Sequence, residues 1–136
     1  MHQLKTFIVE DSPLIRDSLI ATLEELVPVK VVGTAEDELT AIQWLSKADN
    51  HCDLMIVDIF LKSGSGLGVL AAAQGLAKKC ELVVLSNYAT PDIRRKCLAL
   101  GANHVFDKSN EIEALIAYCG HLAAGESADN THGAVP

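Results

Sequence analysis

Four apolar stretches of this chain are each followed, directly or one residue later, by side chains that can take part in phosphoryl chemistry. The residues that follow them are Glu10 with Asp11, Asp58, Ser86 and Lys108. In an open parallel α/β sheet the carboxyl ends of the strands meet along one crevice. We therefore expect carboxylates, a hydroxyl and an ammonium group to share one pocket. This set of groups suits a divalent metal ion and a phosphoryl group.

The carboxylates of this set favour a metal site. Glu10 and Asp11 are adjacent in the sequence, and their charges repel each other unless a cation neutralises them. Asp58 follows a fully apolar stretch, and a carboxylate in such a site can accept a phosphoryl group as an aspartyl phosphate. Mg²⁺ usually binds through one or two carboxylates together with waters and phosphate oxygens. Asp11 and Asp58 meet that demand, and Glu10 would hold a metal-bound water.

The remaining two residues suit the phosphoryl group itself. Lys108 supplies a positive charge for the phosphoryl oxygens, and the Ser86 hydroxyl can bond one of these oxygens. Simpler roles remain open for two members of the set. Asp11 can be an N-cap of the helix that follows, although Ser12 can perform that task alone. Ser86 can be a turn residue, since Asn87 comes next.

Apolar stretches alternate with segments of helical periodicity along the chain, a pattern that predicts a parallel sheet with crossover helices. The second strand contains Lys30 and is therefore placed at an edge of the sheet. Right-handed crossovers leave few topologies, and we expect a flavodoxin-like (βα)5 three-layer sandwich with the strand order 2-1-3-4-5. The strands are predicted at residues 4–9, 29–33, 53–57, 81–85 and 103–107.

Helix signals occupy the intervals between these strands. Ser12 and Thr90 each precede a proline and predict a capped helix start. Asn110, with Glu113 three residues later, predicts the start of the last helix. Apolar residues at helical spacing predict the buried faces. These are Ile15, Leu19, Leu23 and Leu26 in the first helix, Leu39 and Ile42 in the second (36–47), Leu70, Ala73 and Ala77 in the third (67–78), Ile93, Cys97 and Leu100 in the fourth, and Ile112, Leu115, Ile116, Cys119 and Leu122 in the last.

Length and composition restrict the functional class. The chain has 136 residues, of which 49% are hydrophobic, and a net charge of −7. We expect one globular domain over residues 1–124 and a flexible, small and polar tail over 125–136. The acidic balance disfavours direct nucleic-acid binding. Because no apolar run approaches the roughly 20 residues of a membrane span and no signal peptide is recognisable, we expect a cytoplasmic protein without membrane contact. Four widely spaced cysteines favour reduced thiols over a zinc site or disulfides.

Taken together, these motifs resemble the receiver domain of two-component response regulators. The resemblance spans residues 4 to 123. It rests on the acidic pair in residues 8–12, the acceptor in residues 54–58, Gly66 eight residues after that acceptor, the hydroxyl in residues 84–87, and Gly101-Ala102 followed by Asp107-Lys108. The resemblance implies that Asp58 is the phosphoacceptor, that Glu10, Asp11, Asp58 and the Phe60 carbonyl hold Mg²⁺, and that Ser86 and Lys108 engage the phosphoryl group.

The resemblance also implies the partners. The phosphoryl donor would be a phosphohistidine on a sensor histidine kinase or a histidine phosphotransfer protein. The protein would not be an enzyme beyond its own phosphorylation and dephosphorylation. The fourth and fifth helices are expected to bind a downstream protein target, with Arg94, Arg95 and Lys96 as a basic patch, or alternatively as a solvated helix face. We expect a monomer or a weak phosphorylation-linked dimer.

Three positions depart from the family pattern. Lys62 stands where proline is usual, so the loop over residues 61–66 is expected to be looser. Ser109 stands where proline usually follows the lysine, and without proline the cis peptide that is common there is costly. The aromatic switch residue of the family aligns with Val105 in this chain. Phe106 cannot replace it in the same place, because adjacent residues of a strand face opposite sides of the sheet.

Three other functions compete with a phosphorylation-controlled signalling module that has no attached output domain. A degenerate receiver would bind a partner without phosphorylation, but the acidic pair, acceptor, hydroxyl and lysine are all present. A phosphohydrolase of the haloacid dehalogenase type needs a second aspartate two residues after the first, where this chain has Phe60. Nucleotide binding is disfavoured because neither G-x-x-x-x-G-K-[ST] nor G-x-G-x-x-G occurs.

Overall fold

The computed structural model describes residues 3–76 and 79–125. Over these residues, five parallel strands alternate with five helices, and the strand order is β2-β1-β3-β4-β5. The predicted flavodoxin-like (βα)5 fold is therefore confirmed, with β2 at an edge. The elements are β1 (Leu4–Val9), α1 (Pro13–Leu26), β2 (Val29–Ala35), α2 (Glu38–Ser46), β3 (Leu54–Val57), α3 (Gly66–Gly75), β4 (Glu81–Ser86), α4 (Pro91–Ala99), β5 (His104–Asp107) and α5 (Ile112–Ala123).

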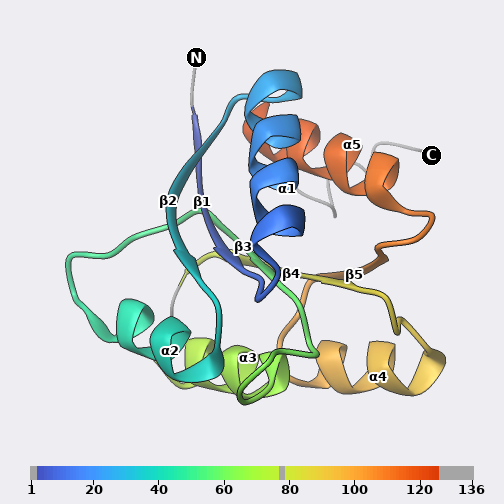
Figure 1. The fold of residues 1–136 in the computed structure, drawn as a ribbon. Helices are drawn as coiled ribbons and strands as arrows, with labels where there is room; N and C mark the ends of the chain where they lie inside the picture. The colour runs from blue at the N-terminus through green and yellow to red at the C-terminus, as the bar shows by residue number, and fades with distance from the viewer. Residues whose placement is uncertain (1–2, 77–78, 126–136) are drawn as a thin grey trace.

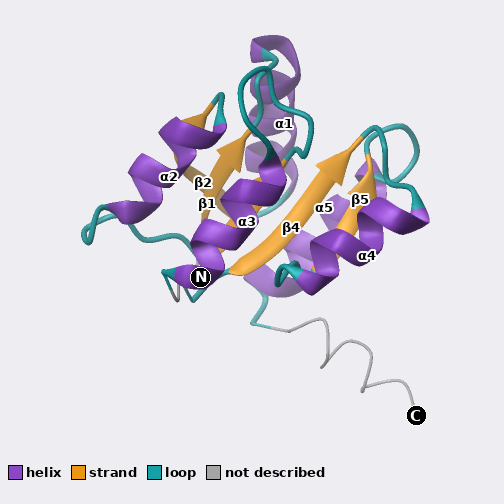
Figure 2. Cartoon of the chain, turned by 90° about the horizontal axis from the view of Figure 1, so that it is seen from below, coloured by secondary structure: helices purple, strands orange, loops and turns teal. Residues whose placement is uncertain are grey.

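The sheet is covered by helices on both faces, as Figure 1 shows, with α1 and α5 on one face and α2, α3 and α4 on the other. Figure 2 looks onto the second of these layers. Successive strand residues point to opposite faces, so β1 places Phe7 in the core beneath α2 to α4 and Ile8 in the core beneath α1 and α5. The near-continuous apolar strands thus fill two cores at once, which holds their carboxyl ends at one edge.

Two of the predicted helix starts are confirmed and one is wrong. The side chains of Ser12 and Thr90 each accept a hydrogen bond from the backbone N–H three residues further on, at 3.3 and 3.2 Å. The N-cap of α5 is Glu111 rather than Asn110, and it makes no side-chain cap bond. The Glu111 carboxylate instead accepts from the backbone N–H of Asp107 at 2.8 Å.

The predicted inward faces are confirmed only in part. In α1, Leu19 and Leu23 are buried, whereas Leu26 is 60% exposed. In α2 the prediction for Leu39 is wrong, because this side chain is 67% exposed while Ala41 and Leu45 are fully buried. The Trp44 ring stacks on Phe7 with centroids 4.0 Å apart, and the small Ala41 side chain lets the helix lie close to the sheet. Ala77 and residues 126–136 lie outside the described residues.

The structure bears on two expectations from the composition, one about the cysteine thiols and one about membrane spans. Cys97 and Cys119 are buried in the two cores, and burial raises the pKa of the Cys119 thiol to about 12, so this thiol stays protonated. Among the helices of the described residues, each is too short or too polar to cross a lipid bilayer.

The start of α3 packs directly on the backbone after β3, which makes Gly66 a sensitive position. A Cβ there would lie 2.2 Å from the Asp58 carbonyl oxygen and 2.8 Å from Ile59 Cα. We expect Gly66→Ala to lower the free energy of unfolding by about 2 kcal/mol, because overpacking forces the backbone to shift. Urea denaturation measures this change.

The matched control for this prediction is Gly75→Ala at the other end of α3, where an added Cβ meets nothing within 4 Å. Alanine is the better helix former, so this variant should gain about 0.5 kcal/mol. Changes of the same sign in the two variants would contradict the role of close packing at Gly66.

Candidate functional site

Charged side chains from three strands meet at the carboxyl edge of the sheet. Glu10 directly follows β1, Asp58 directly follows β3, and Lys108 directly follows β5. The Lys108 Nζ lies 2.6 Å from Glu10 Oε1 and 2.9 Å from Asp58 Oδ2. The three side chains are only 9%, 4% and 10% exposed for Lys108, Glu10 and Asp58. One buried ammonium group thus joins two buried carboxylates.

Asp11 completes an acidic cluster at this edge. Glu10, Asp11 and Asp58 each offer a carboxylate oxygen, and these oxygens lie within 4.8 Å of one another. The cluster lines a cavity of about 180 Å³, to which Phe60 and Lys108 also contribute. Hard oxygen donors at this separation fit a small divalent cation that keeps part of its water shell. The donor set therefore suits Mg²⁺ chemically.

Burial and ion pairing shift the pKa values of the charged groups of the site in opposite directions. Burial raises the pKa of Glu10, although the bond to Lys108 and a hydrogen bond from the Ser12 N–H at 3.1 Å act against the rise. Burial alone would lower the pKa of Lys108, but its hydrogen bonds to Glu10 and Asp58 outweigh burial and raise it. Lys108 is therefore a stable ammonium group between the carboxylates.

Phe60 lies at the mouth of this cavity. Its N–H donates to Asp58 Oδ1 at 3.3 Å, so the loop after β3 contacts the carboxylate directly. The Phe60 ring is 51% exposed and meets the Tyr88 ring edge to face, with centroids 4.8 Å apart. Both aromatic residues line the cavity. The two rings thus form part of the wall of the cavity that Asp58 also lines.

Ser86 is placed differently from the other predicted site residues. It is fully buried at the end of β4, and the residues that line the cavity are its neighbours Asn87 and Tyr88 rather than Ser86 itself. Its Oγ accepts a hydrogen bond from the Tyr88 N–H at 3.1 Å. This bond uses an oxygen lone pair and leaves the hydroxyl proton able to donate. The structure thus brings Glu10, Asp11, Asp58, Phe60 and Lys108 together around one cavity, whose lining does not include Ser86.

Arg94 has a structural role that its sequence position does not reveal. Its guanidinium donates to the carbonyl oxygens of Ala89 and Val105, both at 2.9 Å, and to Glu111 Oε1 at 2.8 Å. The bond from Arg94 lowers the pKa of the Glu111 carboxyl. Two members of the predicted basic patch therefore have acidic partners, because Arg94 pairs with Glu111 and Arg95 pairs with Asp92.

Val105, which aligns with the family's switch position, and its neighbour Phe106 face opposite layers of the molecule. Val105 is buried in the core beneath α4, and Phe106 is buried in the core beneath α5. The Phe106 ring stacks on His104 with centroids 4.2 Å apart. The prediction that Phe106 cannot occupy the place of Val105 is confirmed.

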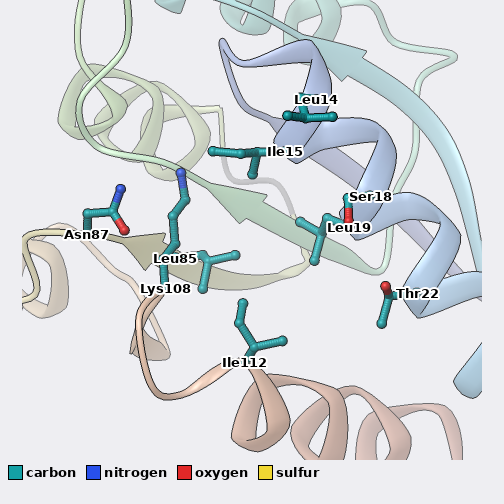
Figure 3. A pocket seen from close by; sticks show the side chains of 9 residues that line it. All are labelled: Leu14, Ile15, Ser18, Leu19, Thr22, Leu85, Asn87, Lys108 and Ile112. Carbon is teal, nitrogen blue, oxygen red and sulfur yellow. The ribbon is translucent and has the colours of Figure 1, made fainter.

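A second, larger cavity adjoins the acidic site. It measures about 580 Å³ and runs between α1 and α5, where Figure 3 shows Leu14, Ile15 and Leu19 of α1 facing Ile112 of α5. Lys108 lines both cavities, as do Ile15 and Asn87. Sequence periodicity assigned Ile15 to the core, but 38% of this residue is exposed. An apolar groove thus leads to the charged site.

Comparison of the sequence and the structure with known proteins identifies a family that matches this chain. The response regulator receiver domain family matches residues 6–119. The transcriptional regulatory protein MalR of Bacillus subtilis is 26% identical over 110 residues, which cover 81% of this chain and 46% of that protein. The chain spans between 25% and 57% of the length of the curated relatives that it matches.

Two solved structures share the fold. The signal receiver domain of the putative response regulator NarL from Mycobacterium tuberculosis has a TM-score of 0.76 at 22% identity, covering 93% of this chain and 100% of that one. A response regulator protein from Burkholderia pseudomallei, solved with a phosphorylated aspartic acid, calcium ion and citrate, has a TM-score of 0.74 at 19% identity, covering 90% and 70%.

Lys108→Met removes the cation that faces Glu10 and Asp58. We expect the free energy of unfolding at neutral pH to fall by about 3 kcal/mol, because an uncompensated buried charge remains. Burial already raises the pKa of Glu10, so Glu10 takes up a proton more easily in the folded chain than in the unfolded chain. The deficit should therefore be smallest below the ordinary pKa of Glu10 and should grow as the pH rises through the raised value. Urea denaturation over a pH series measures it.

The control for this series is Lys96→Met, which removes the same charge from an exposed position on α4 and should change the free energy of unfolding by less than about 0.5 kcal/mol. A Lys108→Met deficit that stays constant with pH would show that the Glu10 charge is not its source.

Proposed function

Because this chain belongs to the response regulator receiver domain family, we propose that it accepts a phosphoryl group on Asp58 in a Mg²⁺-dependent reaction and thereby changes its protein partners. The observation that carries the proposal is the buried Asp58 carboxylate, which lies 2.9 Å from Lys108 Nζ within the cluster formed with Glu10 and Asp11. The Burkholderia pseudomallei structure, which has a phosphorylated aspartic acid and a calcium ion, supports the same chemistry in this fold.

Each residue of the site has a role in this proposal. The Asp58 carboxylate attacks the phosphorus atom of the donor, forming an O–P bond as the P–N bond of a phosphohistidine breaks. Lys108 then pairs with a phosphoryl oxygen, and the Ser86 hydroxyl donates to another. Asp11, Asp58 and the Phe60 carbonyl would hold Mg²⁺, with Glu10 acting through a bound water. The metal ion would supply positive charge that neutralises the phosphoryl oxygens.

The apolar groove between α1 and α5 is the surface that we assign to the phosphoryl donor. It opens beside Lys108, and Leu14 on its rim is 81% exposed. A phosphohistidine carried on a helix of a sensor kinase or phosphotransfer protein could place its apolar neighbours in this groove (Figure 3). A donor docked there would bring the phosphoryl group to Asp58 from the side of α1.

The output of the switch is assigned to α4, β5 and α5. Ser86 and Lys108 lie at the ends of the strands that lead into these helices. In this proposal a downstream protein reads the changed surface, the receiver occupies residues 1–124, and the protein works in the cytoplasm as a monomer or weak dimer. The function is that of a signalling phosphoacceptor rather than a classical enzyme.

Asp58 is predicted to be the sole phosphoacceptor. Incubation with a small phosphodonor and Mg²⁺ should add one phosphoryl group, measured by intact-protein mass spectrometry. Asp58→Asn keeps the size of the side chain and removes the nucleophilic oxygen, so it should abolish the added mass. Asp53→Asn, a carboxylate at the opposite end of β3, is the control and should be labelled normally. Labelling of Asp58→Asn, or labelling that persists in EDTA, would refute the assignment.

The phosphoryl group is predicted to be lost slowly. Hydrolysis requires a water in line with the P–O bond, and the Phe60–Tyr88 pair at 4.8 Å covers the cavity while neither side chain is a carboxylate or amide that could place that water. Phe60→Asn and Tyr88→Ala should each speed the decay of the isolated phosphoprotein by about tenfold, the effect of about 1.4 kcal/mol in barrier height. Decay of the parent as fast as the variants would contradict aromatic shielding.

A further inference from the structure

The segment that joins β3 to α3 is held by a residue of another helix. Glu38, the first residue of α2, lies against it although 27 positions separate Glu38 from Ser65. Glu38 Oε1 accepts a hydrogen bond from the Ser65 N–H at 2.8 Å, and the Glu38 N–H donates to the Ser63 carbonyl oxygen at 3.2 Å. The side chain and the backbone of one residue thus fix the segment at two points.

Two glycines leave the space that the Glu38 side chain fills. A Cβ on Gly64 would lie 2.4 Å from the Glu38 Cβ, and a Cβ on Gly68 would lie 2.3 Å from Glu38 Oε2. Gly64 also has a φ of 80°, which side chains disfavour.

The same segment is bonded to the Asp58 carboxylate. Ser65 pairs with Phe60 in an antiparallel bridge, and the Phe60 N–H donates to Asp58 Oδ1 at 3.3 Å. Continuous contacts therefore lead from Glu38 through Ser65 and Phe60 to Asp58. Lys62 occupies the place where a proline is usual in the family, so the backbone here has no ring to restrict it.

We propose that Glu38 is a positioning residue of the acceptor site, which fixes the segment over residues 60–65 and through it the Phe60 backbone and the Asp58 carboxylate. The proposal rests on the proposed function, because the phosphoryl and metal roles of Asp58 and Phe60 come from it. Glu38 itself touches neither the phosphoryl group nor the metal ion. Its contribution is to keep the oxygen ligands in place before either arrives.

Glu38→Ala removes the carboxylate and keeps the backbone bond to Ser63. In metal-free protein we expect faster amide hydrogen exchange confined to residues 60–65, and in calorimetry about tenfold weaker Mg²⁺ binding, as for other residues that orient metal ligands. Glu38→Gln keeps the Oε1 acceptor and should behave like the parent. Glu36→Ala, which removes a carboxylate that pairs with Arg16 on the surface, is the charge control and should also behave like the parent.

The proposal is overturned by parent-like exchange and Mg²⁺ affinity in Glu38→Ala. It is also overturned if Glu38→Gln or Glu36→Ala is as impaired as Glu38→Ala, because charge rather than the hydrogen bond would then be responsible. Failure of the parent to take a phosphoryl group would refute the proposed function instead. The exchange measurement, made without metal or donor, would still decide whether Glu38 holds the segment.

Gly68→Ala provides a second variant, in which residue 38 itself is unchanged. The added Cβ would displace the Glu38 carboxylate while alanine favours the helix, so we expect faster exchange in residues 60–65 without loss of protection in α3. In the Glu38→Ala background the same substitution should have no further effect on this segment, because its target is gone. Strictly additive effects of the two substitutions would overturn the proposal.

Discussion

The burial of three charges at one edge of the sheet is the constraint that the rest of the structure satisfies. An isolated buried charge is costly, and Lys108 is tolerated because Glu10 and Asp58 lie 2.6 and 2.9 Å from its Nζ. The three residues follow β1, β3 and β5, so these strands must keep a fixed register relative to one another. The two apolar cores maintain that register, since each strand contributes alternate residues to both.

Much of this arrangement could be predicted because its signals are local. A strand that is covered on both faces is apolar throughout, so the polar residue that follows it stands out in the sequence. Asp58 after residues 54–57 is the clearest example. The edge position of β2 was also predictable, because Lys30 interrupts its apolar pattern. Strand ends and the crossover rules together bring Glu10, Asp58 and Lys108 to one edge without knowledge of any contact.

The features that sequence reasoning missed depend on partners far away along the chain. Helix α2 has nine residues, too few for periodicity to choose between a face with Leu39 and a face with Ala41. Its packing against Phe7 decides this. In the sequence, Arg94 cannot be distinguished from its exposed neighbours. Its partners, Glu111 and the backbone carbonyls of Ala89 and Val105, all lie outside α4. The bond from Ser65 to Glu38 likewise joins segments that no local pattern relates.

Val105 packs beneath α4 without an aromatic ring, and Phe106 packs in the opposite core. Hydrogen bonds therefore add to the apolar packing that joins α4 to the charged site. Arg94 joins the Ala89 carbonyl, three residues after Ser86, to Glu111, three residues after Lys108. A lysine could not make these bonds at once, since its ammonium lacks the planar fork that reaches several acceptors in fixed directions. The position of α4 therefore depends on both loops that leave the site, because Arg94 bonds to each of them.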